Sequence, residues 1–298
     1  MNANSYSRAT LASGLLWLVP ALWALNYIVA RRAPGVIGPY ALALGRWSLA
    51  GALLLLGCAP ELWQRRAHLR QYGWQYVVLG FFGMVICGAW VYIGAHSTGA
   101  MNISLIYAAS PVLIAVGAVC WLGERMRTRQ VGGVVLTLIG VLYVISKGDW
   151  TALLHLQFTV GDGWIVAATL AWAAYALLQK HWPSPLSATA RLCATSWGGV
   201  LLLLPCAVWE SSQPGALPLT PQGWWLVIVA ALAPGVGAYW IYGWAQKILG
   251  ASRVAVVLYL GPLYGALAAW GLLNEPLGWH HVIGAVLILP GVFLVTSG

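Results

Sequence analysis

The stretch SPVLIAVGAVCWLGERM, residues 110–126, occurs a second time in the chain as GPLYGALAAWGLLNEPL, residues 261–277. Each copy has a proline near its start, a long apolar run and a glutamate near its end. One offset of 151 residues relates both landmarks, which are Pro111 and Pro262 at the start and Glu124 and Glu275 at the end. The same apolar helix, met twice in the same register, indicates an internal duplication.

The duplication extends beyond this helix. Residues 131–146, VGGVVLTLIGVLYVIS, match residues 282–297, VIGAVLILPGVFLVTS, at nine of sixteen positions with no change of offset. Each copy holds five apolar segments, and an odd number makes the second copy enter the membrane from the opposite side. The sequence therefore predicts two inverted five-helix repeats, residues 1–149 and 150–298.

The composition places the chain in a membrane. Of its 298 residues, 61% are hydrophobic and only 7% are charged, whereas soluble domains carry about 25% charged residues. Spanning roughly 30 Å of hydrocarbon requires about 20 apolar residues in a helix. We expect an all-α polytopic membrane protein with ten transmembrane helices, near residues 11–30, 38–58, 74–95, 101–122, 130–146, 162–180, 188–209, 224–246, 252–273 and 281–297. The longest predicted connections are residues 59–73, 147–161 and 210–223.

The basic residues follow the positive-inside pattern. With the N-terminus in the cytoplasm, eleven Lys and Arg residues fall inside and three outside, and Arg46 is left within a span. Short cytoplasmic connections of membrane proteins are enriched in these residues. We therefore expect a multi-pass protein of the cell inner membrane with both termini cytoplasmic, and we attribute the net charge of +9 to topology, not to nucleic-acid binding. The first apolar segment lacks an A-x-A cleavage pattern, so we expect it to be retained.

Several motifs give the chain a family resemblance. They are Trp23-x-x-Asn26 in the first span, Arg46 in the second, Gly99-Ala100, Pro111 and Gly123-Glu124 around the fourth, and Gly133 and Gly140-Val141 in the fifth, with Pro262, Glu275, Gly284 and Gly291-Val292 in the second half. In this order the chain resembles the drug/metabolite transporter superfamily, and within it the ten-helix EamA-type permeases. One departure is Asn274, which stands where the second Gly-Glu pair would have glycine.

The resemblance covers essentially the whole chain and implies a function. Members of this family move small metabolites, amino acids and drugs across the inner membrane, most often outward. The many Trp and Tyr residues make the chain most similar to the aromatic amino-acid exporters among them. The expected partners are a small-molecule substrate and the lipid bilayer, and no obligatory protein partner is inferred.

Enzyme chemistry is not indicated. The five Cys residues show no metal-site spacing, and no nucleophile–base pair or acidic dyad falls in mid-span. We therefore expect no enzyme activity, no cofactor and no metal.

Arg46 is the one basic residue predicted well inside a span. An ionisable residue in hydrocarbon costs at least ~2.5 kcal/mol on insertion scales, so it usually faces a polar interior. Three interpretations remain open: Arg46 anchors a substrate carboxylate, or it bonds carbonyls at helix ends as a structural residue, or the span boundary lies elsewhere.

Aromatic residues in mid-span are the other candidates for substrate binding. Trp and Tyr at helix ends fit the interfacial aromatic belt, whereas mid-span rings with polar tips suit a cavity for an amphipathic solute. The candidate substrate-binding residues are Trp17, Trp23, Asn26, Tyr27, Arg46, Tyr92, His96, Tyr107, Trp172, Tyr175, Tyr239, Tyr242, Tyr259 and Tyr264. The alternative for each ring is simple packing, and for His96 it is an interfacial position or a role in coupling.

The landmarks of the repeat have roles of their own. Pro111 and Pro262 are candidate hinges, because proline frees backbone carbonyls and bends a helix; static kinks are the alternative. Glu124 and Glu275 are candidate structural residues that tie two helices across a tight turn, where the start of the next helix favours an acid. Proton coupling is their alternative role. No Asp or Glu falls near the middle of a predicted span, which disfavours carboxylate-based proton antiport.

Together these features predict an inner-membrane transporter that exports small amphipathic metabolites, foremost amino acids including aromatic ones. The expected mechanism is alternating access of the two halves around a central aromatic-lined cavity. A multidrug or organic-cation exporter of the same fold is the first alternative. A non-transporting membrane sensor or an intramembrane enzyme is the alternative of another class.

Overall fold

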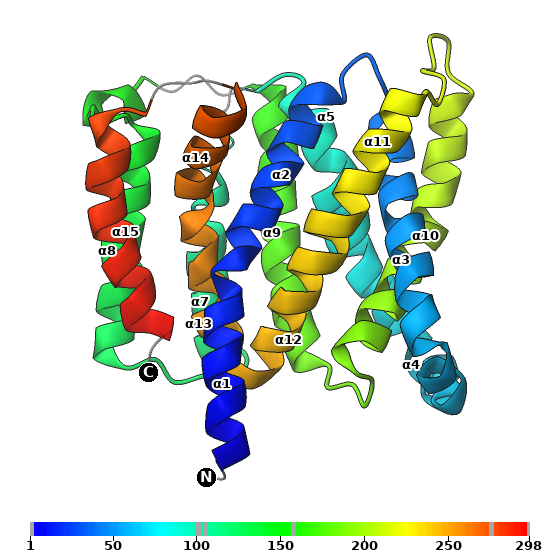
Figure 1. The fold of residues 1–298 in the computed structure, drawn as a ribbon, viewed down its shortest axis with the longest axis horizontal. Coiled ribbons are helices and arrows are strands. Elements are labelled where there is room, and N and C mark those ends of the chain that lie inside the picture. The colour runs from blue at the N-terminus through cyan, green and yellow to red at the C-terminus, as the bar shows by residue number, and fades with distance from the viewer. Residues whose placement is uncertain (1–2, 99–102, 104–105, 156–158, 274–276, 297–298) are drawn as a thin grey trace.

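The computed structural model describes residues 3–98, 103, 106–155, 159–273 and 277–296. Every regular element within these ranges is helical. Eight helices are long and apolar enough to cross a membrane, and two shorter apolar helices, Ser110–Cys120 and Ala251–Leu267, stand where the fourth and ninth spans were predicted (Figure 1). The prediction of an all-helical polytopic membrane protein is confirmed.

The elements follow one another as a series of up-and-down helices. Those of the first half are α1 (Ala3–Leu16), α2 (Leu18–Arg32), α3 (Pro39–Gln64), α4 (Arg66–Gly80), η1 (Phe81–Trp90), α5 (Val91–Ala95), α7 (Ser110–Cys120) and α8 (Thr128–Ile145). Those of the second half are η2 (Trp150–Leu153), α9 (Val160–His181), α10 (Ala188–Ser211), α11 (Pro221–Ala230), η3 (Ala231–Ala238), α12 (Tyr239–Leu249), α13 (Ala251–Ala255), η4 (Val256–Leu260), α14 (Gly261–Leu273) and α15 (Trp279–Thr296).

One predicted connection is helical instead. α3 continues to Gln64 and α4 begins at Arg66, so residues 59–73 form no extended loop. Hydropathy falls where the chain leaves the lipid, but the polar run QRRAHLRQY at residues 64–72 consists mostly of good helix formers. The end of an apolar run therefore marks the membrane boundary and not the end of the helix.

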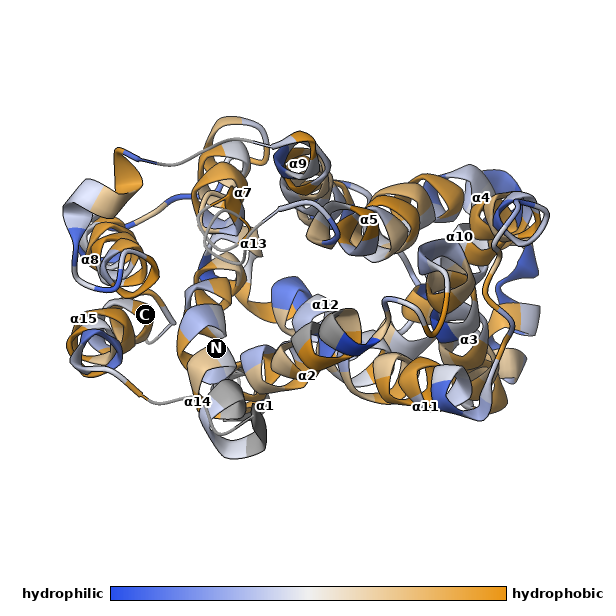
Figure 2. Ribbon diagram, turned by 90° about the horizontal axis from the view of Figure 1, so that it is seen from above, coloured by the Kyte–Doolittle hydropathy of each residue, from blue (hydrophilic) through white to orange (hydrophobic). Residues whose placement is uncertain are grey.

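Two long antiparallel pairs frame the bundle: α3 packs along α10, and α8 packs along α15 (Figures 1 and 2). Glycine brings the second pair close together. A Cβ atom on Gly133 of α8 would lie 2.7 Å from the carbonyl oxygen of Gly291 on α15, and the reverse distance is the same. Small residues at such crossings let two backbones approach closely inside a membrane.

Four of the spans are irregular inside the bundle. η1 and η3 are π-helical turns within the third and eighth spans, at residues 81–90 and 231–238. In the ninth span the 3₁₀ turn η4 ends at Leu260, two residues before Pro262, and in the fourth span α7 begins directly before Pro111. Irregular turns inside long helices often mark functional sites. Here they occur about 151 residues apart, as the duplicated sequence does.

The two chain ends lie at one face of the bundle, called the terminal face below (Figure 1). This face also carries the α3–α4 junction, the connection from α7 to α8, the connection from α9 to α10, and the junction of α12 with α13. The eleven basic residues predicted to lie together belong to these segments and to α1. The opposite face carries Arg32 and Lys147.

Candidate substrate site

Six aromatic rings from four helices meet in the middle of the bundle. Centroids of neighbouring rings lie 4.9–6.1 Å apart, and most of the pairs are edge-to-face or tilted. Aromatic pairs prefer such geometry to a face-to-face sandwich. The group, called the central aromatic cluster, consists of Trp23 of α2, Trp47 of α3, Trp172 and Tyr175 of α9, and Tyr239 and Tyr242 of α12.

Helical spacing and one glycine explain how the rings meet. Trp172 and Tyr175 are three residues apart on α9, as are Tyr239 and Tyr242 on α12, so each pair shares a helix face. Gly83 of η1 makes room beside them, because a Cβ there would lie 2.7 Å from the Tyr175 ring. The Gly83 carbonyl accepts a 2.8 Å hydrogen bond from the Tyr239 hydroxyl. The π-helical turn is therefore one wall of the cluster.

Arg46 of α3 lies beside this cluster and is only 2% exposed. Its Nη1 donates to Asn26 Oδ1 at 3.2 Å and to the Tyr92 hydroxyl at 3.5 Å, and that hydroxyl donates to Asn26 Oδ1 at 2.8 Å. The guanidinium carbon lies 4.7 Å from the centre of the Trp47 ring. Within the described residues all partners of Arg46 are thus neutral. A buried cation without an anionic partner is costly, and an anion that met Arg46 here would offset part of that cost.

Buried polar atoms around the cluster have hydrogen-bonding capacity to spare. Leaving such an atom unpaired costs about 1–3 kcal/mol, so most buried polar groups are paired. In the described part of the chain the unpaired atoms near the cluster include Arg46 Nε, Nε1 of Trp47 and Trp172, and the hydroxyl of Tyr242. The centre of the bundle therefore offers donors and aromatic faces together, which suits an amphipathic solute.

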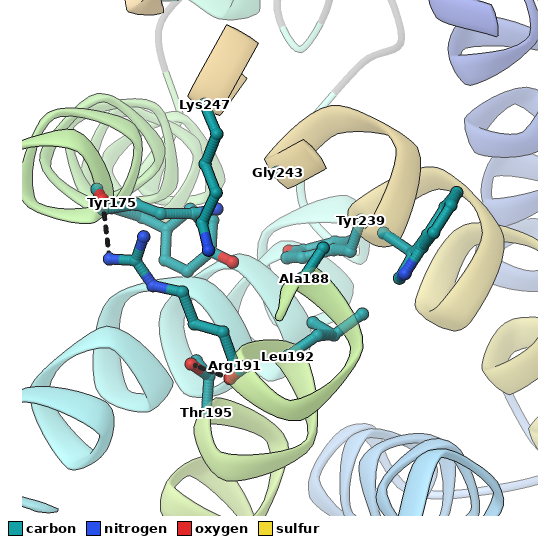
Figure 3. Close-up of a pocket in the computed structure, with 10 residues that line it drawn as sticks. Tyr175, Ala188, Arg191, Leu192, Thr195, Tyr239, Gly243 and Lys247 are labelled. Carbon is teal, nitrogen blue, oxygen red and sulfur yellow. Dashed lines mark hydrogen bonds between the residues drawn. The ribbon is translucent and has the colours of Figure 1, made fainter. Parts of the chain in front are cut away.

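Toward the terminal face the cluster gives way to a small cavity (Figure 3). Tyr175 and Tyr239 border it together with Arg191 of α10 and Lys247 of α12. Its volume of about 10 Å³ is close to the space of one water molecule. The cavity therefore has room for about one water molecule between the cluster and the terminal face.

Both cations of this cavity hold backbone carbonyls. The Arg191 guanidinium donates to the carbonyl oxygens of Gln179 at 2.6 Å and Trp182 at 2.8 Å, and Lys247 Nζ donates to that of Leu186 at 2.7 Å. The last carbonyls of a helix lack intrahelical partners and carry partial negative charge. Arg191 therefore caps the C-terminal end of α9, and the two side chains together fasten the connection to α10.

The acidic side chains of the described residues all accept hydrogen bonds from amides at helix starts. An acid is favourable there, because it meets unpaired N–H groups and the positive end of the helix dipole. The bonds run from Ser187 to Glu61, from Ala251 and Ser252 to Glu124, from Thr151 to Asp149, from Thr159 to Asp162, and from Tyr40 and Ala41 to Glu210. At Asp149 the bonds from Thr151 lower the pKa of the carboxyl.

Glu124 has a different partner from the expected one. The sequence suggested a tie to α8, the next helix, but the carboxylate accepts bonds from Ala251 N at 2.8 Å and from Ser252 N at 3.1 Å at the start of α13. It therefore connects the two halves of the chain. Sequence spacing cannot reveal this contact, because 127 residues separate the partners. Glu275, its counterpart in the repeat, lies outside the described residues.

The other predicted site residues divide into three groups. Trp23, Asn26, Arg46, Tyr92, Trp172, Tyr175, Tyr239 and Tyr242 come together at the centre, as described above. Buried or half-buried positions elsewhere in the core belong to Trp17, Tyr259 and Tyr264, whereas half-buried Tyr107 lies near Tyr239 of the cluster. Pro111 and Pro262 lie at the starts of α7 and α14. His96 is exposed at the end of α5, away from the cluster, and the side chain of Tyr27 lies outside the described part.

Four residues of the site were missed from the sequence. Trp47 was not among the mid-span rings, although its position next to Arg46 was a usable signal. Arg191 was counted only as a topology marker, yet it is 5% exposed. Gln179 and Gln246 are buried amides near the ends of α9 and α12, and Gln246 Nε2 donates to the Ala176 carbonyl at 2.6 Å. Polar residues near span ends gave no sign of burial.

A multi-pass helical bundle with an unneutralised cation and unpaired donors among aromatic rings at its centre is the architecture of a membrane transport protein. Comparison with known protein families also places the chain among membrane transport proteins. The chain belongs to the EamA-like transporter family, which matches residues 11–146 and again residues 159–297. The resemblance noted from the sequence motifs is confirmed, and the protein is a transporter rather than an enzyme.

Three relatives align with almost the whole chain. "Uncharacterized transporter YyaM" of Bacillus subtilis (strain 168) is 29% identical over 92% of this chain and 89% of its own length. The "Probable amino-acid metabolite efflux pump" of Salmonella typhimurium is 26% identical over 95% and 94%. The "Probable terminal-alkyne amino-acid exporter" of Streptantibioticus cattleyicolor is 25% identical over 94% and 91%. One crystal structure, 18% identical, superposes with a TM-score of 0.74 over 98% of this chain and 97% of its own, which shows the fold alone.

Proposed function

We propose that this protein exports amphipathic metabolites that carry a carboxylate, foremost amino acids including aromatic ones, across the cell inner membrane. The observation that carries the proposal is Arg46, a buried cation whose described partners are all neutral, placed against a cluster of aromatic rings. Two of the relatives bear names of amino-acid or amino-acid-metabolite exporters, which supports the substrate class and the outward direction.

In this proposal the two parts of the site recognise the two parts of the solute. The carboxylate accepts charge-assisted hydrogen bonds from Arg46, whose fork of N–H groups matches a carboxylate. The side chain of the solute packs among Trp23, Trp172 and Tyr239. The unpaired hydroxyl of Tyr242 adds a hydrogen bond to the polar end of the solute.

Alternating access of two inverted halves is the proposed mechanism. The duplicated sequence, its odd number of spans and the matching irregular turns in the third and eighth spans support it. Both π-helical turns border the site: Gly83 of η1 lies against Tyr175, and Gly235 of η3 lies beside Arg46. In this proposal, a conformational change at either π-helical turn therefore moves residues that contact the bound solute. The cytoplasmic location of the terminal face is part of the same proposal, supported by its basic residues.

Export of organic cations is the second candidate. Aromatic faces attract cations, and the central cluster supplies six rings. The buried charge of Arg46 opposes this reading, because a like charge in a site of low polarity is repelled. The two candidates therefore differ in the sign of charge that the site favours.

A flux assay with matched solutes tests the proposal. The purified protein is reconstituted into liposomes, and uptake of tryptophan, its amide tryptophanamide (which keeps the ammonium but lacks the carboxylate), threonine and a hydrophobic cation is measured against protein-free liposomes. We expect tryptophan to move fastest and the amide at least about tenfold more slowly, because the amide lacks the carboxylate for Arg46. Faster movement of the cation would favour the second candidate, and no flux of any solute would refute both.

A further inference from the structure

A second cavity opens at the terminal face, apart from the central aromatic cluster. It measures about 370 Å³, within the range of small-ligand pockets. Its wall includes the connection from α7 to α8, the ends of α9 and α12, and the start of α13. Both halves of the chain therefore contribute to it.

Three cations line this cavity and lack anionic partners. They are Arg125 from the connection after α7, Lys180 near the end of α9, and Arg253 on α13. Within the described residues none of the three forms an ion pair or a side-chain hydrogen bond. Arg127 and Arg129 add further positive charge near Arg253.

Glu124, the acid in the described part of the wall, attracts Arg253 but leaves Arg125 and Lys180 unpaired. Both oxygens of Glu124 accept bonds from the start of α13: Oε1 from Ala251 N, and Oε2 from Ser252 N and, at 2.7 Å, from Ser252 Oγ. Gly250, with φ of 92°, allows this approach, since a Cβ there would lie 3.0 Å from Glu124 Oε1. The carboxylate is thus directed at backbone amides, and the cavity keeps an excess of positive charge.

The arrangement of the cations indicates the chemistry of a ligand. A single carboxylate satisfies one guanidinium fork, whereas cations on three separate segments suit a group with several charged oxygens pointing in different directions. Phosphate-bearing groups have this property. We propose that the cavity binds a phosphate-bearing anion, and that the bound anion bridges the two halves of the chain at the terminal face.

Thermal unfolding with inorganic pyrophosphate as the probe tests this site on the full-length protein in neutral detergent. We expect a saturating rise in the unfolding temperature of about 3–6 °C, because a ligand that binds only the folded state stabilises it by mass action. Sodium chloride at the same ionic strength should not reproduce the rise. A rise of the same size with chloride would overturn the proposal, since it would reflect general screening of the basic face.

A pair of matched double variants locates the site. Arg125→Gln with Lys180→Gln removes one cavity cation from each half, and Arg65→Gln with Arg70→Gln removes two exposed cations from the same face outside the cavity. All four side chains are exposed, so both variants should fold. The first should weaken the apparent pyrophosphate affinity at least about tenfold, and the second should leave it unchanged. Equal affinities in the two variants would overturn the proposal.

The source of the phosphate group is decided in vesicles. The protein is reconstituted in phosphatidylcholine alone and in phosphatidylcholine with phosphatidylglycerol. If the pyrophosphate effect persists in neutral lipid and is lost with the anionic lipid in the wild type, a lipid headgroup competes for the site. If anionic lipid makes no difference, a soluble phosphate compound is the ligand. In both cases the pyrophosphate effect should depend on Arg125 and Lys180. Neither outcome depends on which solute the protein exports.

Discussion

Two buried arginines on one antiparallel helix pair have different surroundings. Arg46 of α3 meets side chains, at 3.2 Å from Asn26 and 3.5 Å from Tyr92. Arg191 of α10 meets backbone carbonyls, at 2.6 and 2.8 Å, in and just beyond the last turn of α9. Each is at most 5% exposed, and among the described residues neither pairs with a carboxylate.

The difference is in line with a structural role for Arg191 and with the proposed substrate-binding role of Arg46. Carbonyls at a helix end have fixed positions and partial negative charge, so Arg191 has a partner built into the fold. The partners of Arg46 are longer contacts to neutral side chains, which can reorient when an anion arrives. Burial alone therefore does not identify a binding residue; the identity of the partner atoms does. Matched substitutions at the two positions should separate the two roles.

The largest effect is expected for Arg191→Met. Methionine replaces the apolar stem of the arginine, but the carbonyls of Gln179 and Trp182 lose their donor. Each buried acceptor left unpaired costs about 1–3 kcal/mol, so we expect a loss of roughly 2–4 kcal/mol of stability. Thermal unfolding in detergent measures it, and Arg70→Met, at an exposed position, is the control. A variant as stable as the control would mean that Arg191 does not cap α9.

Arg46→Met should show the opposite pattern. Removing a buried, unneutralised cation costs little stability, so the unfolding temperature should stay close to that of the wild type. Transport of a carboxylate solute should fall by about 30- to 100-fold, in line with a lost charged hydrogen bond of about 2–3 kcal/mol. Flux in proteoliposomes, measured beside Arg70→Met, gives the ratio. A destabilised variant with proportionate loss of flux would make Arg46 structural, like Arg191.

The acids that cap these two helices offer a smaller contrast. Glu210, at the end of α10, accepts bonds from Tyr40 and Ala41 at the start of α3, and Glu61, at the end of α3, accepts bonds from Ser187 at the start of α10. The pairing is reciprocal, but the contacts of Glu61 are solvent-exposed. Glu210→Gln should therefore cost about 1 kcal/mol and Glu61→Gln about half as much. Unfolding temperatures of both variants check the order; a larger loss at Glu61 would contradict it.

The smallest effect on transport is expected for Tyr92→Phe. The hydroxyl links Asn26 and Arg46, and a neutral hydrogen bond of this kind contributes about 0.5–1.5 kcal/mol. We expect the KM for a carboxylate solute to rise about two- to fivefold, because Arg46 loses one of its orienting contacts. Tyr72→Phe on α4, away from the site, serves as the matched control. An unchanged KM would leave Asn26 as the sole positioning residue.

Much of the fold was predictable, because lipid imposes simple rules on sequence. Runs of about 20 apolar residues had to become membrane helices, and the observed Pro39–Gln64, Val160–His181 and Ala188–Ser211 each contain or closely follow a predicted span. Helix ends outside the lipid were harder, since water tolerates either helix or loop. That is why α3 and α4 nearly join where a connection was expected.

The site was predictable in its residue types but not in its partners. Arg46 and the mid-span Trp and Tyr residues could be predicted as site residues, because charged groups and polar side-chain ends are rare in the hydrocarbon layer. The contacts of Glu124 with α13 and of Arg191 with α9 depend on tertiary packing that no spacing encodes. The π-helical turn η1 was equally hidden, because its residues are ordinary apolar ones, whereas Pro234 in η3 does mark that span as interrupted. Gly83 and Gly235 indicate only that a close approach was possible.

The π-helical turn η1 also sets the rotational phase of the helix that follows it. A π-helix rotates less per residue than an α-helix, so the side chains beyond η1 point in a different direction from the one that an unbroken α-helix would give them. Tyr92 comes two residues after η1 and owes its direction toward Asn26 to that offset. Deleting one apolar residue from Phe81–Trp90 would therefore leave a continuous helix that still crosses the membrane, but with Tyr92 turned away. A single-residue deletion in η1 should therefore change the direction of the Tyr92 side chain while the helix still crosses the membrane.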